Sequence, residues 1–203
     1  GQGTFKSVSG AMYVGQWAAG QKSGQGSYTY ASGDAYEGEW LNGKLDGQGT
    51  YRYMSGDEYV GFFEDDHPHG MGKMTYAGED TFEGEWEAGM KSGQATYTFA
   101  QGGQYKGGYA NNLFHGVGTF SYANGDEYTG SYEQGKRTGL GRFVPADKSY
   151  CYEGDFKNNK FKCVSQCLNY LSPFLIPNSN ILNTQLNPIC SHNSLTFSSF
   201  HPY

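Results

Sequence analysis

The chain has 203 residues, including 32 glycines and 34 aromatic residues (18 Tyr, 13 Phe and 3 Trp), and only 36% are hydrophobic. Disordered chains are poor in aromatic residues and collagen has glycine at every third position, so the composition argues against disorder and excludes collagen. The net charge of −6 argues against a general nucleic-acid binder. The longest apolar stretch, Leu168 to Ile176, is too short and too interrupted for a membrane-spanning helix.

Charge is distributed unevenly along the chain. Residues 31–87 carry 14 acidic and three basic side chains, whereas residues 88–162 carry six acidic and nine basic ones. Four cysteines come late, and no secretory signal precedes the body of the sequence, so we expect a cytoplasmic location. Because the chain lacks an initiator Met and Gly1 lies within a repeating pattern, we also expect it to be a fragment.

A five-residue block is repeated along the chain. The segment YEGEW at Tyr36–Trp40 returns in related form at spacings of 23 residues and finally 24. Its first position is Tyr or Phe, its third is Gly and its fifth is aromatic in all seven copies. The copies begin at Tyr13, Tyr36, Tyr59, Phe82, Tyr105, Tyr128 and Tyr152. Such self-similarity is typical of a repeat architecture.

A second block, such as DGQGTYRY at Asp46, follows each first block. The pattern fails after Tyr152, because Cys163 stands where a glycine is expected. We therefore predict a repeat array over residues 1–160, with six full repeats and a partial repeat at each end. Residues 161–203 carry no charge beyond Lys162, and we expect them to form a poorly ordered tail.

Each block has the character of a β-strand. In the first block, the period of two places Tyr36, Gly38 and Trp40 on one face and both glutamates on the other. The glycine between two rings predicts a place where a ring lies over the backbone. One repeat is then one hairpin, with a loop in LNGKLDG and a turn in MSGDE. Stacked hairpins predict an all-β fold: an elongated single-layer array of antiparallel hairpins, about 60–70 Å long.

These residues support a family resemblance. The pattern YEGEW-x2-G-x3-G-x-G-x-Y resembles the MORN (membrane occupation and recognition nexus) repeat over about residues 1–160. The resemblance implies an all-β rod of stacked hairpins, in agreement with the pattern of the residues themselves. The sequence departs from the repeat at Ala95, at Asp66 and Asn112 in the loop glycine position, and after Asn159. We expect these departures to weaken individual turns.

No catalytic constellation is found in the sequence. His69 and His115 share a repeat position with Ser, Asp and Thr, which favours a turn over a functional histidine. His67, beside Asp65 and Asp66, is a weak metal candidate, and a solvated loop is favoured there. Cys163, Cys167, Cys190 and His192 offer enough ligands for zinc, but the last two are too closely spaced for a usual finger, so free thiols are favoured. We expect no enzyme activity, no metal and no cofactor.

The array predicts a scaffold that binds partner proteins and self-associates through its open edges. The resemblance implies roles at cytoskeletal structures, cilia and membrane–cytoskeleton junctions. As interaction residues, structural or docking, the sequence suggests seven rings: Tyr36, Trp40, Tyr51, Tyr59, Phe63, Trp86 and Tyr109.

Two alternatives remain open from the sequence. The first is binding to anionic membrane lipids, including phosphoinositides, which needs clustered basic side chains. The candidates lie near the end of the array: Lys136, Arg137, Arg142, Lys148, Lys157, Lys160 and Lys162. The second is that the array is the regulatory part of a larger enzyme, since similar repeats are attached to phosphatidylinositol-phosphate kinases and to a lysine methyltransferase.

Overall fold

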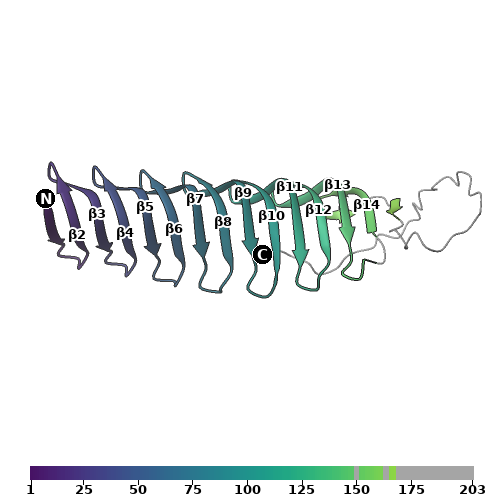
Figure 1. The fold of residues 1–203 in the computed structure, drawn as a ribbon, viewed down its shortest axis with the longest axis horizontal. Helices are drawn as coiled ribbons and strands as arrows, with labels where there is room; N and C mark the ends of the chain where they lie inside the picture. Colours follow the sequence, from purple (N-terminus) through teal and green to yellow (C-terminus); the bar gives the residue numbers. More distant parts are fainter. Residues whose placement is uncertain (149–150, 162–164, 168–203) are drawn as a thin grey trace, which may run out of the picture.

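A computed structural model describes residues 1–148, 151–161 and 165–167. Every regular element in the described residues is a β-strand, and the strands form one 16-stranded sheet. Strands β1 to β15 pair in chain order, and β16 pairs with β14. Figure 1 shows the result as an elongated ladder of strands, with the first strand at one end. The all-β, single-layer array of stacked hairpins predicted from the sequence is confirmed.

The strands have the following bounds: β1 Gln2–Lys6, β2 Met12–Ala18, β3 Gln21–Thr29, β4 Ala35–Leu41, β5 Lys44–Arg52, β6 Glu58–Glu64, β7 His67–Thr75, β8 Thr81–Glu87, β9 Met90–Thr98, β10 Gly103–Ala110, β11 Leu113–Tyr122, β12 Glu127–Glu133, β13 Lys136–Val144, β14 Cys151–Lys157, β15 Lys160–Phe161 and β16 Ser165–Cys167.

Two-residue turns close the hairpins. Between β4 and β5, Asn42 and Gly43 have φ angles of 50° and 87°, so both central residues are left-handed, as the favoured hairpin turn requires. The amide of Gly43 also donates to the carbonyl oxygen of Lys22 in the preceding repeat, at 2.9 Å. The tips are therefore linked along the array, and the hairpin loop is shorter than the seven residues expected from the sequence.

The departures at the loop glycine keep the left-handed geometry of these turns. Asp66, Asn112 and Asn159 adopt left-handed φ angles of 69°, 68° and 65°, which Asp and Asn tolerate better than most residues. Their side chains also accept backbone N–H groups of the preceding repeat, from Leu45, Lys91 and Arg137, at 2.8 Å. The replacing side chains therefore add a bond between repeats, and weaker turns stay a prediction.

One face of the sheet carries the core. Tyr36, Gly38 and Trp40 are buried and Glu37 is exposed, so the predicted alternation is confirmed. Register keeps the second block on the same face, since Tyr51 is paired with Tyr36 on one side and with Tyr59 on the other. We call this the aromatic face. The opposite face bears polar and charged residues and a few exposed apolar ones.

Paired glycines make room for the first ring of each repeat. A Cβ atom added to Gly38 would lie 2.5 Å from the hydroxyl of Tyr36, and Gly49 on β5 lies under the same ring. The ring thus covers glycines of its own hairpin, and its hydroxyl donates to the Glu39 carbonyl at 2.9 Å. A ring over the backbone at this glycine was predicted, although the ring comes from the same strand.

The fourth full repeat solves the same packing problem with different residues. Its first ring is Phe82, and Ala95 stands where the other repeats have the second glycine. A phenylalanine has no hydroxyl, so the space under its ring edge is free for the Ala95 methyl group. The two departures therefore compensate each other.

One cysteine forms a disulfide that was not predicted from the sequence. Cys151 is fully buried and disulfide-bonded, and it lies opposite Cys167 in the pairing of β14 with β16. The zinc candidates Cys163, Cys190 and His192 lie outside the described residues, and the side chain of Cys167 is likewise not described.

Candidate functional site

The first and fifth rings of the repeats form one continuous cluster, which we call the closed ladder. Tyr36 contacts Trp40 in its own repeat and Phe63 in the next, with ring centroids 5.3 and 5.2 Å apart and planes nearly perpendicular. The same edge-to-face contacts recur along the array, and such pairs stabilise beyond their buried area. Its buried members are Tyr13, Tyr36, Trp40, Tyr59, Phe63, Phe82, Trp86, Tyr105, Tyr109, Tyr128, Tyr132 and Phe156.

Six of the seven suggested interaction rings belong to the closed ladder. Tyr36, Trp40, Tyr59, Phe63, Trp86 and Tyr109 are each at most 6% exposed. Such burial leaves them no surface to offer a partner, so it assigns them to packing between repeats. The exception is Tyr51, which is half-buried and lies outside the ladder.

Tyr51 belongs to a second row of rings on the same face, which we call the open row. Its members occupy the sixth and eighth positions of the second block, and all are half-buried: Tyr28, Tyr30, Tyr51, Tyr53, Tyr76, Tyr97, Phe99, Phe120, Tyr122 and Phe143. Neighbouring rings touch, for example Tyr51 and Tyr53 with centroids 4.5 Å apart. Partly exposed, packed rings of this kind are typical of docking surfaces.

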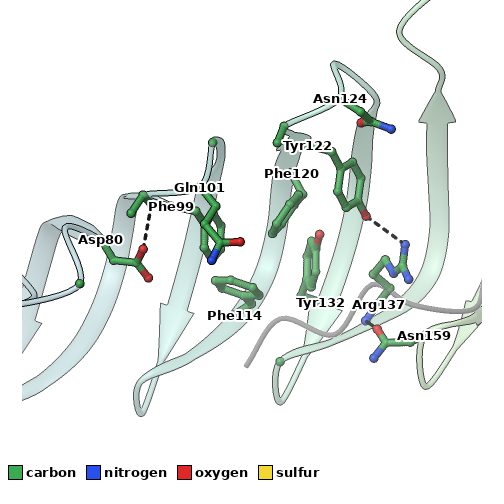
Figure 2. Close-up of a pocket in the computed structure, with 15 residues that line it drawn as sticks. Asp80, Phe99, Gln101, Phe114, Phe120, Tyr122, Asn124, Tyr132, Arg137 and Asn159 are labelled. Carbon is green, nitrogen blue, oxygen red and sulfur yellow. Dashed lines mark hydrogen bonds between the residues drawn. The ribbon is translucent and has the colours of Figure 1, made fainter.

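The open row borders a pocket of about 540 Å³, lined by residues from the turn between β7 and β8 to the turn between β14 and β15. Figure 2 shows Phe99, Phe120 and Tyr122 along one side and Phe114 and Tyr132 toward the hairpin tips. The polar groups of Asp80, Gln101, Asn124, Arg137 and Asn159 stand around these rings. An apolar lining with a few polar groups is the usual character of a binding pocket.

Sequence reasoning did not select the pocket rings Phe99, Phe114, Phe120, Tyr122 and Tyr132. The position of such rings relative to the strand ends is a signal that could have identified them. Tyr53 follows the last residue of β5, Phe99 follows the last residue of β9, and Tyr122 ends β11. A ring at the margin of a sheet has fewer neighbours to cover it than a ring in the middle of a strand.

Basic side chains occupy the same repeat position, or slot, on the aromatic face in three of the repeats, nine residues after the first ring. The Lys22 ammonium lies 3.8 Å from the ring centroid of Trp40, and Lys91 lies 5.1 Å from that of Phe82. Burial among the rings lowers the pKa of both lysines. In the sixth repeat, Arg137 takes this slot over Tyr128 and Phe156, and its guanidinium donates to the Tyr122 hydroxyl at 3.3 Å. Such contacts are favourable cation–π pairs.

The suggested lipid-facing residues do not gather on one face. Arg137 lies on the aromatic face, whereas Arg142 lies on the opposite face and pairs with Glu153 at 3.4 Å. Lys136, Lys157 and Lys160 are exposed near hairpin tips, and Lys148 is exposed in the turn after β13. Lys162 lies outside the described residues.

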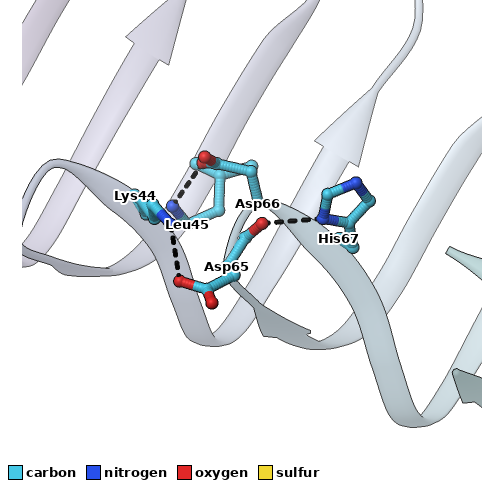
Figure 3. Close-up of polar contacts among 5 residues, drawn as sticks. All are labelled: Lys44, Leu45, Asp65, Asp66 and His67. Atoms are coloured by element: carbon cyan, nitrogen blue, oxygen red, sulfur yellow. Dashed lines mark hydrogen bonds and ion pairs between the residues drawn. The ribbon is translucent and has the colours of Figure 1, made fainter. Parts of the chain in front are cut away.

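The turn between β6 and β7, with Asp65, Asp66 and the adjoining His67, makes hydrogen bonds and an ion pair with neighbouring residues (Figure 3). Asp65 pairs with Lys44 at 2.8 Å, and its backbone carbonyl lies 2.7 Å from the His67 ring nitrogen Nδ1. Asp66 accepts the Leu45 amide at 2.8 Å. Among the residues that the structure describes, no group of three or more His, Cys, Asp or Glu side chains could hold a metal ion. The same residues contain no helix long and apolar enough to cross a membrane.

The MORN repeat family model matches seven consecutive segments of this chain: residues 13–35, 36–58, 59–81, 82–104, 105–127, 128–149 and 152–162. MORN repeats indicate a repeat protein used for protein or lipid interaction. No curated protein sequence matches the chain.

Solved structures of TCP domains are similar to this chain. The Drosophila melanogaster SAS-4 (dCPAP) TCP domain, solved with a proline-rich motif of Ana2 (dSTIL), is 11% identical with a TM-score of 0.45, covering 83% of this chain and 84% of that one. The Danio rerio CPAP domain, solved with a STIL peptide, is 12% identical with a TM-score of 0.32, covering 82% and 88%. Similarities this low carry no argument about function.

Proposed function

Because the chain belongs to the MORN repeat family, we propose that it is a non-enzymatic scaffold whose open row binds an extended segment of a partner protein. The observation that carries the proposal is the pocket beside Phe99, Phe120 and Tyr122, where the half-buried rings of the open row border a hollow on the aromatic face.

Its shape and chemistry suit an extended peptide. Strands cross the long axis of the array, so the open row runs from repeat to repeat and offers successive ring contacts at about 10 Å intervals. Aromatic-lined grooves commonly hold polyproline-like segments, which lose little conformational entropy on binding. The polar groups around the pocket provide hydrogen bonds that fix the peptide's register.

The arrangement of basic residues favours a protein partner over a lipid surface. Electrostatic membrane binding needs several basic side chains facing one plane. Arg137 and Arg142 lie on opposite faces, and each already has a partner within the chain. Self-association stays a prediction from the open edges of the array. A cytoskeletal or ciliary location and attachment to a larger enzyme stay predictions from the family resemblance.

The test is selection of binding peptides followed by variants of one strand. A library of random peptides displayed on phage is selected on the purified chain, and affinities of enriched peptides are measured by fluorescence anisotropy. We expect Phe120→Ala to lower the affinity of these peptides for the chain by about tenfold or more, because it removes a ring from the pocket wall. Val117→Ala is the matched control, since Val117 lies on the same strand but is 67% exposed on the opposite face.

Two results would contradict the proposal. One is a selection that enriches no peptide. The other is a set of peptides whose affinity is unchanged by Phe120→Ala, or is lowered as much by Val117→Ala, which would place binding outside the pocket.

A further inference from the structure

The face opposite the aromatic face carries three exposed apolar side chains close together. Val60 and Phe62 on β6 are 44% and 47% exposed, and Met71 on β7 is 57% exposed. Val60 and Phe62 flank Gly61, which is paired with Gly72, the residue after Met71. We call Val60, Phe62 and Met71 the apolar patch. Contiguous exposed apolar side chains are typical of an interaction surface.

Acidic residues hold the matching positions in the repeats on both sides. Val60 and Phe62 are the second and fourth residues of their five-residue block, and the blocks of β4 and β8 have glutamate at both of these positions. These glutamates, which we call the flanking carboxylates, are Glu37 and Glu39 on β4 and Glu83 and Glu85 on β8. Each pair lies two strands from β6, which is about 10 Å at the usual spacing of strands. The apolar patch is therefore bordered by carboxylates in both directions along the array.

One arginine and one lysine lie on this face near the apolar patch. Arg52 on β5 pairs with Glu58 at 2.9 Å and reaches Glu37 at 4.0 Å. Lys73 on β7 is paired in the strand register with Glu83 on β8. These two side chains offset part of the negative charge that β4, β6 and β8 carry.

The remaining carboxylates leave the face negative. In the part of the chain that the structure describes, neither Glu39 nor Glu85 forms an ion pair. Glu64 lies 3.2 Å from the ring of His69, which is charged only when it is protonated. Residues 31–87 contain 14 acidic side chains and three basic ones. Such a surplus of one sign attracts groups of the opposite charge.

We propose that this face is a second docking surface, occupied by a basic segment of a partner protein. Apolar side chains at the centre of the segment cover the apolar patch, and lysine or arginine side chains on both sides of that centre reach the flanking carboxylates. The same charge repels phosphates, so it disfavours anionic lipid headgroups and nucleic acids as occupants. Because this surface lies on the other side of the sheet from the open row, the inference goes beyond the function proposed above and does not depend on it.

The distance between the apolar patch and the flanking carboxylates sets the pattern of the segment. An extended chain advances about 3.3 Å per residue, so about three residues span the distance from β6 to β4 or to β8. We therefore expect basic residues about three or four positions before and after the apolar centre.

Three synthetic peptides with this spacing test the proposal. KKGLFLGKK has basic ends and an apolar centre, KKGSSSGKK lacks the apolar centre, and EEGLFLGEE reverses the charge. Each peptide is titrated into the chain with ¹³C-labelled methyl groups. We expect KKGLFLGKK to shift the methyl signals of Val60 and Met71, and the other two peptides to shift them far less. Val117 is the internal control, since it is 67% exposed on the same face but lies where basic residues outnumber acidic ones.

Variants separate the apolar contribution from the charge. Phe62→Gln installs the glutamine found at this position in the first repeat, and it should lower the affinity for KKGLFLGKK by about fivefold or more. The double variant Glu39→Gln, Glu85→Gln keeps an acceptor for the Gln94 amide, which Glu85 accepts at 3.0 Å. It should weaken binding and make the affinity less sensitive to salt. Val117→Gln is the matched control and should bind like the unaltered chain, and thermal melts establish that each variant folds.

The inference is overturned if KKGSSSGKK or EEGLFLGEE binds as well as KKGLFLGKK, if no peptide shifts the Val60 and Met71 signals, or if Phe62→Gln and Val117→Gln bind alike. A loss of affinity in Phe120→Ala would place KKGLFLGKK at the pocket on the aromatic face and would also reject the second surface. Peptides selected on the chain that depend on Phe120 would still support the proposed function, so the two proposals fail separately.

Discussion

The closed ladder and the open row are made of the same residue types on the same face of the same sheet, yet they differ in exposure. Tyr59 of the ladder is fully buried, because its ring lies over Gly61 and Gly72 and is flanked by Phe63 and Trp86. Tyr53 of the open row is half-buried beyond the end of β5. The difference shows that position within the strand separates rings that hold the repeats together from rings available to a partner.

High pH should destabilise the closed ladder and the open row together, which is the largest effect we expect. Burial raises the pKa of Tyr30, Tyr76 and Tyr128 to about 12, above the ordinary value near 10. Since the folded state favours the neutral phenol, this stability is complete below pH 10 and is lost as the pH rises through 12. Thermal melts between pH 8 and 12 should show the melting temperature falling only above pH 10. An unchanged melt at pH 12, or a fall that begins below pH 9, would contradict the burial of these rings.

Removing one ring from the closed ladder and one from the open row should lower the free energy of unfolding by different amounts. Trp40→Ala should cost about 3–5 kcal/mol, because a buried ring leaves a cavity and its indole N–H loses the Gly26 carbonyl at 3.1 Å. Tyr53→Ala should cost much less, since its ring is already partly in water. Chemical denaturation of the two variants provides the measurement, and equal losses would mean that the two rows do not differ.

The repeat containing Phe82 allows the ring–glycine fit to be broken and restored. Phe82→Tyr should cost about 1–3 kcal/mol, because its hydroxyl would overlap the methyl group of Ala95. Adding Ala95→Gly should recover most of that loss by recreating the arrangement of the other repeats. Denaturation of the single and double variants tests this, and additive losses would show that the two positions are not coupled.

The smallest effects distinguish two hydroxyls within the closed ladder. Tyr105 donates to the Gly108 carbonyl at 3.0 Å, so Tyr105→Phe should lose about 1 kcal/mol. The buried Tyr109 hydroxyl has no hydrogen-bond partner within the described part of the chain, so Tyr109→Phe should be neutral or stabilising by up to about 1 kcal/mol. Melting temperatures that move in the same direction for both variants would contradict this assignment.

Much of the fold could be predicted from the sequence because its determinants are local. The 23-residue spacing places each glycine relative to its ring, and alternation within YEGEW fixes the buried face of a strand. The turns were less predictable, since Asp66 gains its bond from Leu45, a residue 21 positions earlier. Such contacts arise only when hairpins are stacked.

The candidate site was harder to predict for the same reason. Tyr36 and Tyr53 are both aromatic and face the same side, so periodicity could not show that one is covered and the other partly open. The pocket is lined by residues of several repeats, from Asp80 to Asn159, which come together only when the hairpins are stacked.

Hydroxyl-radical footprinting of the intact chain, read by mass spectrometry, compares both rows most directly. We predict slow modification of Tyr36, Tyr59 and Tyr105 and much faster modification of Tyr30, Tyr53 and Tyr122. Equal rates for the two groups, or faster modification of the first, would contradict the division of the aromatic face into a closed ladder and an open row.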